Sequence, residues 1–409
     1  MRLLHSSDWH LGRQLYGRRR YEEFAAFLDW LVARIEAEAV DVLLVAGDIF
    51  DSTAPSNRAQ QLYYRFLCRV AASSCSHVVV VAGNHDSPTF LEAPRELLRA
   101  LDVHVVGAPS ADPREQVLTL RDARGEPAMI VCAVPYLRDR DLRSVAAGES
   151  TEDKERKLTE GIRDHYAAVA AQAEALRAEL GPALPLVATG HLFTAGGQTV
   201  DGDGVRELYI GSLGHVGAGI FPDCFDYVAL GHLHVPQRVA GREHIRYCGS
   251  PLPMGFGEAR QRKVVLRVDF AGRRPQVAAL EVPRFQALER LSGDLPALEA
   301  QLRERAGRGE PLWLELVYDG EDVVGDLRER LEAALGDSPL EILRLRNTRL
   351  IERVLGRMGD EETLDDLDPR QVFQRLLEAR DVPPAARPAL TASYAEVLGA
   401  LADADPQAE

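Results

Sequence analysis

Five apolar runs in the sequence each end in a short polar block that carries Asp, Asn or His. The clearest is the valine-rich run His77 to Ala82, which the block Gly83-Asn84-His85-Asp86 follows at once. Such a run is typical of a strand buried on both faces, and the glycine lets the backbone turn. Function in α/β proteins usually lies where such strands end. The other four blocks begin at Ser6, Gly47, Gly190 and Gly231.

Together the blocks supply enough oxygen and nitrogen donors for two adjacent divalent cations, if one carboxylate bridges them. Mixed carboxylate, amide and imidazole donors suit manganese, iron or zinc. The polar blocks contain no cysteine, which argues against a structural zinc site. Two cations about 3.5–4 Å apart can bind both the attacking and the leaving oxygen of a phosphoryl displacement. The set therefore predicts phosphoester hydrolysis, with the candidate metal ligands Asp8, His10, Asp48, Asn84, His191, His232 and His234.

The strength of this prediction comes from the combination. Any one of these histidines would more often be an ordinary polar residue than a ligand. Five such blocks in order, each after an apolar strand, rarely occur without a functional site. The remaining histidines lack this setting and are expected to take no part in the chemistry: His5, His77, His104, His165, His215 and His244.

Length and charge limit the possible functions. At 409 residues the chain is too long for one compact core, so two or three domains are expected. The formal net charge of −15 argues against a general nucleic-acid binder, which would bind through a basic face. It does not exclude a metal-dependent enzyme that acts on phosphates, because bound cations can reverse the local charge. A basic partner subunit could also supply the groove.

The composition, with 46% hydrophobic and 27% charged residues, is that of a soluble globular protein. The chain reaches a charged turn at Asp8 after too short an apolar run for a signal peptide, and no segment approaches the roughly 18 apolar residues of a membrane span. The five cysteines are widely spaced and form no C-x-x-C pair. We therefore expect a cytoplasmic protein.

Strands and helices alternate over residues 1–282, which predicts an α/β domain with helices over 21–39, 58–70 and 152–180. Residues 283–351 read as a small α+β module, with helices over 296–305 and 322–335 and strands over 312–318 and 340–346. No cluster of Asp or His follows these strands. We therefore expect this module to position substrate rather than to perform chemistry.

The tail, residues 352–409, carries two short amphipathic helices separated by Pro383-Pro384. Asp368-Pro369 is a strong start for the first of them. Two interpretations have equal weight: the helices pack on the main body, or they dock onto a partner helix or coiled coil. Their apolar stripes consist of Val372, Phe373, Leu376 and Leu377, and of Leu390, Tyr394, Val397, Leu398 and Leu401.

The five blocks resemble those of the calcineurin-like metallophosphoesterases. The fuller strings Leu4 to Gly12, Gly47 to Ser52 and Gly190 to Phe193 are similar to the SbcD family, the nuclease subunits of bacterial SbcCD complexes. The resemblance is close in the catalytic domain and extends by layout alone to the small module and the tail. It implies an α/β fold with a four-layer metallophosphoesterase β-sandwich flanked by helices, a small α+β cap domain and a helical C-terminal tail.

The resemblance also implies roles for the candidate residues. One cation would be held by Asp8, His10 and His234, the other by Asn84, His191 and His232, with Asp48 between them. Manganese is the metal that the family prefers. His85 would face the scissile phosphate, where it stabilises charge or protonates the leaving oxygen. Asp51 stands where archaeal and eukaryotic relatives have a catalytic histidine, so its role in catalysis, or in orienting a ligand or water, stays open.

The loop after the first block carries cations and an aromatic ring. Next to a phosphoesterase site, such residues could contact the phosphates of DNA without reading its sequence. The alternative is a solvated turn and helix start, since arginines are common at helix ends. The candidate DNA-binding residues are Arg13, Tyr16, Arg18, Arg19 and Arg20.

The sequence is compatible with three functions. The leading one, implied by the resemblance, is a manganese-dependent DNA nuclease in repair and recombination, an exonuclease on double-stranded DNA and an endonuclease on single-stranded or hairpin DNA. Its partner would be an SbcC-like ATPase of the SMC family bound by the C-terminal helices, with a homodimer inside a heterotetramer near the nucleoid. The alternative is a stand-alone small-molecule phosphodiesterase, which has no evident need of residues 283–409. A scaffold with a degenerate site is least favoured, because every ligand position is filled.

Overall fold

The computed structural model describes residues 1–142, 150–194, 197–199, 217–322 and 324–347, together with single residues and short runs between 373 and 394. The chain divides into two compact units, Met1–Gln286 and Ala287–Glu409. The division lies just beyond the boundary expected at residue 282. None of the described helices combines the length and the apolar character needed to cross a membrane.

Two six-stranded sheets form the frame of the first unit. The first has the strand order β12-β11-β1-β2-β3-β4 and the second β5-β6-β7-β8-β10-β9. Strands β1 to β4 are parallel, as are β6, β7, β8 and β10, and the remaining strands pair antiparallel. The strands are β1 (Arg2–Ser6), β2 (Val42–Ala46), β3 (His77–Val81), β4 (Val103–Val106), β5 (Val117–Arg121), β6 (Pro127–Cys132), β7 (Leu186–His191), β8 (Tyr227–Gly231), β9 (Gln237–Val239), β10 (Arg242–Tyr247), β11 (Val264–Ala271) and β12 (Arg274–Glu281).

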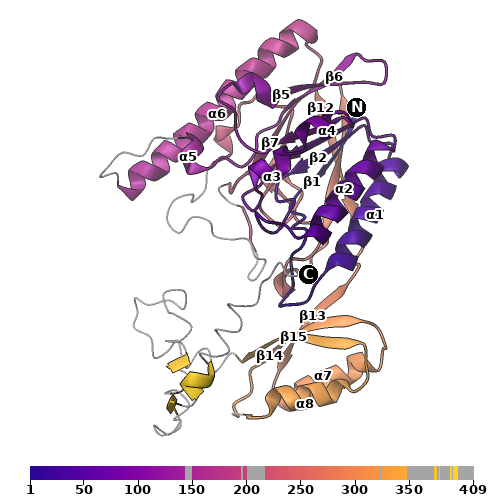
Figure 1. The fold of residues 1–409 in the computed structure, drawn as a ribbon, viewed down its shortest axis with the longest axis vertical. Coiled ribbons are helices and arrows are strands. Elements are labelled where there is room, and N and C mark those ends of the chain that lie inside the picture. The colour runs from indigo at the N-terminus through magenta and orange to yellow at the C-terminus, as the bar shows by residue number, and fades with distance from the viewer. Residues whose placement is uncertain are drawn as a thin grey trace. The chain divides into compact units, whose positions relative to one another are not determined.

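Helices cover the outer faces of both sheets. Figure 1 shows α1 (Tyr21–Ala37) and α2 (Asn57–Ala71) side by side over the first sheet and α6 (Thr151–Leu180) on the opposite side of the unit, over the second. The inner faces pack on each other, so all five residues of β2 are buried. This is the four-layer sandwich that the family resemblance implies. The short helices are α3 (Pro88–Glu92), α4 (Arg95–Arg99), α5 (Asp139–Leu142), η1 (Pro113–Gln116), η2 (Ala218–Ile220) and η3 (Phe256–Glu258).

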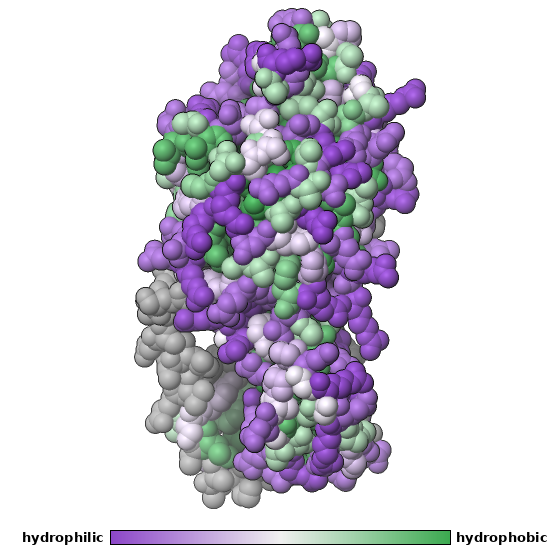
Figure 2. Space-filling view, turned by 90° about the vertical axis from the view of Figure 1, so that its right-hand side faces the viewer, coloured by the Kyte–Doolittle hydropathy of each residue, from purple (hydrophilic) through white to green (hydrophobic). Residues whose placement is uncertain are grey.

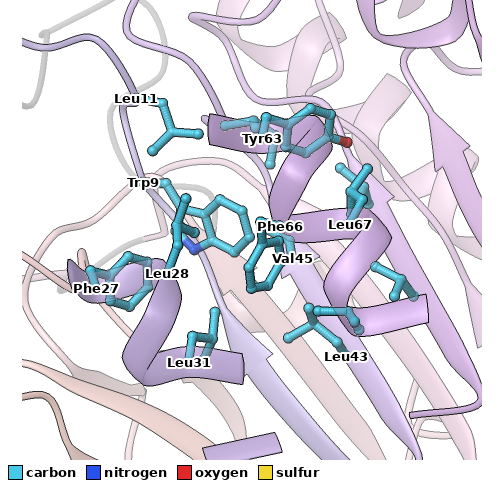
Figure 3. Packing of buried hydrophobic residues seen from close by; sticks show 14 of the residues in the cluster. Trp9, Leu11, Phe27, Leu28, Leu31, Leu43, Val45, Tyr63, Phe66 and Leu67 are labelled. Atoms are coloured by element: carbon cyan, nitrogen blue, oxygen red, sulfur yellow. The ribbon is translucent and has the colours of Figure 1, made fainter. Parts of the chain in front are cut away.

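The core between the first sheet and its helices explains the strand and helix patterns. Leu43 and Val45 of β2 point into this core, whereas Leu44 and Ala46 point into the core between the sheets. Figure 3 shows Trp9, which follows β1, surrounded by side chains from α1, α2 and β2. The face of the molecule in Figure 2 is largely hydrophilic, with hydrophobic residues dispersed among the charged ones.

The second unit contains a parallel three-stranded sheet, β13 (Ala287–Gly293), β14 (Leu312–Tyr318) and β15 (Leu340–Asn347). Helices α7 (Leu295–Ala306) and α8 (Leu327–Leu335) lie side by side and share a leucine-rich core with it (Figure 1). The expected α+β module omitted β13, so the order β-α-β-α-β was not predicted. Helix α8 begins later than expected because Gly325 disfavours a helix there.

Little of the tail is described. The rings of Phe373 and Tyr394, one from each predicted helix, stack with centroids 4.0 Å apart, and Leu377 is buried. Leu390 is exposed. The other predicted tail residues, namely Asp368, Pro369, Val372, Leu376, Val397, Leu398 and Leu401, lie outside the described residues, as does His215.

Candidate metal centre

Trp9 fixes the first polar block of the candidate centre. Its ring lies edge-to-face with Phe27 and Phe66 in the helix-side core, and its Nε1–H donates to Ser6 Oγ at 2.8 Å. The residues on either side, Asp8 and His10, have φ angles of 54° and 47°, a conformation that L-residues adopt rarely. The buried ring thus anchors a strained turn, and strain of this kind is concentrated at functional sites.

Close backbone approach explains two of the glycines that precede candidate ligands. A Cβ at Gly83 would lie 2.1 Å from Asp48 Oδ1, and a Cβ at Gly47 would lie 2.3 Å from His191 Nδ1. Any other residue at either position would push a candidate ligand aside. Gly47 also has a φ of 91°, which favours glycine independently.

One half of the centre is formed by Asp8, His10 and His234, whose donor atoms converge within 4.8 Å. The Nε2 atoms of the two histidines are 3.2 Å apart. Asp8 Oδ1 accepts a hydrogen bond of 2.8 Å from the backbone N–H of His232. All three side chains are buried, so their donors face one another rather than solvent.

The other half is formed by Asn84, His191 and His232. Asn84 Oδ1 lies 3.0 Å from His191 Nε2 and 3.0 Å from His232 Nδ1. Asp48 joins the two halves, because its Oδ2 lies 3.3 Å from His191 Nε2 and 3.5 Å from His10 Nε2. The structure therefore brings together all the candidate ligands that the sequence predicts.

The donor set fits divalent cations. His191 Nδ1 lies 2.9 Å from the carbonyl oxygen of Ala46, which can only accept, so Nδ1 carries the hydrogen and Nε2 presents a lone pair. That lone pair faces oxygens of Asn84 and Asp48, an arrangement that needs a cation or a proton between the atoms. Burial would lower the pKa of His191, but the charge of Asp48 outweighs it and raises this pKa to about 9.

His85 and Asp51 lie beside the first half. His85 Nδ1 is 2.8 Å from the backbone oxygen of Asp51, and the Asp51 carboxylate lies 3.4 Å from His10 Nδ1 and 3.1 Å from Arg13 Nη1. Burial would raise the pKa of Asp51, but the hydrogen bond and charge of His10, with Arg13, lower it to about 2. Asp51 thus contacts three candidate site residues, His85 through its backbone oxygen and His10 and Arg13 through its carboxylate.

Sequence reasoning assigned no role to Asp86, which follows His85. Its buried carboxylate accepts hydrogen bonds from the backbone N–H groups of Gly83, Ile49 and Phe50, at 2.8, 3.1 and 3.0 Å. It therefore holds together the blocks after β2 and β3. Burial and the charge of Asp48 raise the pKa of Asp86 to about 7. The sequence signal for Asp86 was its place as the fourth residue of the block that begins at Gly83.

Glu258 was also missed. It is fully buried, forms an ion pair with Lys263, and places Oε1 3.5 Å from His234 Nδ1. Burial would raise the pKa of Glu258, but Lys263 and His234 lower it to about 2. Glu258 lies between predicted elements and Lys263 begins the predicted strand over residues 263–270, and neither belongs to a polar block after a strand end, so no sequence signal marks them for this site.

The candidate DNA-binding loop divides into exposed and buried residues. Arg18 and Arg19 are exposed, and Tyr16 is 43% exposed with its ring stacked on Phe256. Arg20 corrects the prediction: it is buried, donates from Nε to Glu23 at 2.7 Å and lies over the Phe24 ring. Its guanidinium is buried against the first turn of α1, so it is not available to a phosphate.

Two family models match the chain. The calcineurin-like phosphoesterase model matches residues 1–236, and the SbcD_C model, described as the type 5 capsule protein repressor C-terminal domain, matches residues 284–381. The second match covers most of the second unit, including part of the tail. These residues lie beyond the first match, so a phosphoesterase domain alone would not account for them.

Several curated relatives are similar along most of their length. The SbcD subunit of the SbcCD nuclease from Escherichia coli K12 is 38% identical over 406 residues, which cover 98% of this chain and 99% of the relative. The protein of the same name from Rhodobacter capsulatus is 37% identical over 85% of this chain and 88% of its own, and that from Bacillus subtilis is 35% identical over 66% of each. From these matches and the architecture of its first unit, the chain belongs to the calcineurin-like phosphoesterase family, within its SbcD group.

Proposed function

We propose that this chain is the nuclease subunit of an SbcCD-type complex and hydrolyses DNA phosphodiester bonds at a centre of two divalent cations. The observation that carries the proposal is the pair of buried donor groups joined by Asp48, whose Oδ2 lies 3.3 and 3.5 Å from a histidine of each group. The relatives' names supply the class of activity, which is that of a nuclease.

In this proposal Asp8, His10 and His234 would hold one cation, Asn84, His191 and His232 would hold the other, and Asp48 would serve both. The cations, for which we propose Mn²⁺, would supply positive charge that polarises the scissile phosphate. His85, fixed through Nδ1 by the Asp51 carbonyl, keeps Nε2 for the phosphate or the leaving oxygen. Asp51 orients His10 through its carboxylate, which supports a positioning role rather than direct catalysis.

Beyond the scissile phosphate, the DNA and the partner would contact the chain outside the centre. We propose that Arg13, Tyr16, Arg18 and Arg19 lie along the DNA path, and that the small module of residues 283–351 positions the duplex. The tail, residues 352–409, would dock on an SMC-type ATPase, in a heterotetramer built on a homodimer of this chain near the nucleoid. The stacked rings of Phe373 and Tyr394 support a paired helical tail.

The test is a hydrolysis assay with Mn²⁺ on linear double-stranded DNA and on a DNA hairpin, with and without the ATPase subunit, against a cyclic nucleotide. The proposal expects DNA cleavage that the ATPase subunit stimulates. Preferential hydrolysis of the cyclic nucleotide, with no cleavage of DNA in either condition, would favour the small-molecule phosphodiesterase instead. Deletion from Asp368 onward should abolish co-purification with the ATPase and preserve Mn²⁺ binding.

A further inference from the structure

A buried carboxylate lies behind His234, on the side away from the candidate metal centre. His234 Nε2 is 3.2 Å from His10 Nε2, whereas Nδ1 is 3.5 Å from Glu258 Oε1. His234 is 2% exposed and Glu258 is fully buried, so water does not compete for this contact. A carboxylate at Nδ1 favours the tautomer in which Nε2 keeps its lone pair for the centre.

The other oxygen of Glu258 is held in place by several donors. Oε2 accepts from the Lys263 ammonium and, at 3.0 Å, from the backbone N–H of Met254. Lys263 also donates to the carbonyl oxygen of His234 at 3.1 Å and to Ser250 Oγ at 3.0 Å. One buried cation thus fixes both the carboxylate and the backbone of the histidine that it faces. Within the described part of the chain, Oε1 has no hydrogen-bond partner, so the ion-pair contact of 3.5 Å with His234 Nδ1 is the polar contact that it makes.

The same arrangement recurs at two other candidate ligands. His191 Nδ1 is held by the Ala46 carbonyl at 2.9 Å, and His10 Nδ1 faces the Asp51 carboxylate at 3.4 Å. In each case Nε2 faces the centre. Metal-binding histidines generally have such an acceptor at the second ring nitrogen, and its loss weakens metal binding about 10–100-fold.

We propose that Glu258, held by Lys263, is a positioning residue for His234, which it orients to bind one of the two cations. This inference rests on the proposed two-metal centre. It predicts an effect confined to one cation, because Glu258 contacts a histidine of the Asp8, His10 and His234 group and not of the other group.

The test is calorimetric titration of the metal-free protein with MnCl₂, comparing the wild type with Glu258→Gln. The wild type should bind two ions, and Glu258→Gln should weaken one binding step about 10–100-fold and leave the other unchanged. The matched control is Glu315→Gln, which removes a fully buried carboxylate paired with Arg290 and Arg344 in the other compact unit. This control should leave both steps unchanged.

A second variant protects the test against misfolding. Glu258→Gln leaves the Lys263 cation buried without the carboxylate that balances its charge, so Glu258→Gln/Lys263→Met removes both charges together. It should again weaken a single step. Co²⁺ absorption spectra should change in both Glu258 variants and not in Glu315→Gln. Two unchanged steps, or equal weakening of both, would overturn the role of Glu258; a wild type that binds no pair of ions would instead overturn the proposed centre.

Discussion

The backbone carbonyl oxygen of Asp51 lies 2.8 Å from Nδ1 of His85. Since a carbonyl oxygen only accepts, Nδ1 carries the hydrogen, and Nε2 is the ring nitrogen that this contact leaves unused. The backbone N–H of His85 donates to Asp48 Oδ1 at 2.9 Å, which fixes the residue from its other end. His85 is therefore held beside the candidate centre by its neighbours, whether or not a cation binds there.

His85→Ala should keep both Mn²⁺ ions and lose hydrolysis. General acid–base groups typically contribute about 10²–10⁴-fold to the rate, so kcat on double-stranded DNA should fall by that factor. Calorimetry with MnCl₂ gives the number of ions bound, and Asn84→Ala, which removes a candidate ligand, is the comparison that should lose one. If His85→Ala also binds one ion fewer, His85 is a ligand and its assignment to the phosphate is wrong.

Asp51→Ala should have the opposite pattern, because the tether of His85 is a backbone carbonyl that the substitution leaves in place. The substitution removes the carboxylate that faces His10 Nδ1 at 3.4 Å and Arg13 at 3.1 Å. We expect one Mn²⁺ to bind about 10-fold more weakly and kcat at saturating Mn²⁺ to stay within a few-fold of wild type. A large loss of kcat with unchanged Mn²⁺ affinity would show that the Asp51 side chain acts in the chemical step.

Much of the fold and the candidate ligands could be predicted because both follow from the order of apolar runs and polar blocks along the chain. The runs that became β1, β2, β3, β7 and β8 are largely apolar, since helices or a second sheet cover both faces, and parallel strands bring their carboxyl ends together. The polar residues that follow them therefore had to meet. Nothing comparable marks Glu258 and Lys263, which meet His234 only through the tertiary fold.

Arg20 shows a second limit of sequence reasoning. Three consecutive arginines suggested one basic surface, yet Arg18 and Arg19 are exposed, whereas Arg20 is buried against Glu23 and Phe24. Arg20 directly precedes α1, and the first turn of that helix supplies both partners. Where a loop enters a helix, the residue type does not show which way a charged side chain points. Contacts with the first helical turn determine that direction.

Trp9→Ala should destabilise the fold and loosen the centre together. Loss of a buried Trp side chain lowers the free energy of unfolding by about 3–5 kcal/mol, and here the neighbours Asp8 and His10 lose the anchor of their strained turn. Phe66→Ala is the matched control, because this ring contacts Trp9 from α2 with centroids 5.2 Å apart. At a temperature where both variants are folded, only Trp9→Ala should bind Mn²⁺ more weakly; equal affinities would show that the turn keeps its form without the indole.

The pH dependence of stability should include a contribution from His5, which is not a candidate ligand. Burial lowers the pKa of His5 from 6.5 to about 3, so between these values the unfolded chain binds a proton that the folded protein does not. The free energy of unfolding therefore falls as the pH falls below 6.5, by up to about 1.4 kcal/mol per pH unit.

His5→Gln removes this titration and keeps a polar group for the Tyr227 hydroxyl, which lies 3.0 Å from His5 Nδ1. In urea titrations of the EDTA-treated protein between pH 7 and pH 5, the variant should lose about 2 kcal/mol less stability than the wild type. Both proteins keep their other histidines, so the difference isolates residue 5. Parallel decreases in the two proteins would show that His5 stays neutral in the unfolded chain or titrates equally in both states.

Arg18→Ala/Arg19→Ala should weaken DNA binding and reduce its dependence on salt. Each phosphate contact contributes about −0.9 to the slope of log K against log salt concentration, so losing two contacts should make the slope less negative by about 2. The matched control is Arg114→Ala/Arg124→Ala, two exposed arginines of the same unit that pair with Asp112 and Asp122. Binding of a labelled duplex, measured from 50 to about 200 mM salt with Ca²⁺ in place of Mn²⁺, gives both slopes. If both double variants keep the wild-type slope, the exposed arginines after the first block form a solvated turn, and the DNA follows another path to the centre.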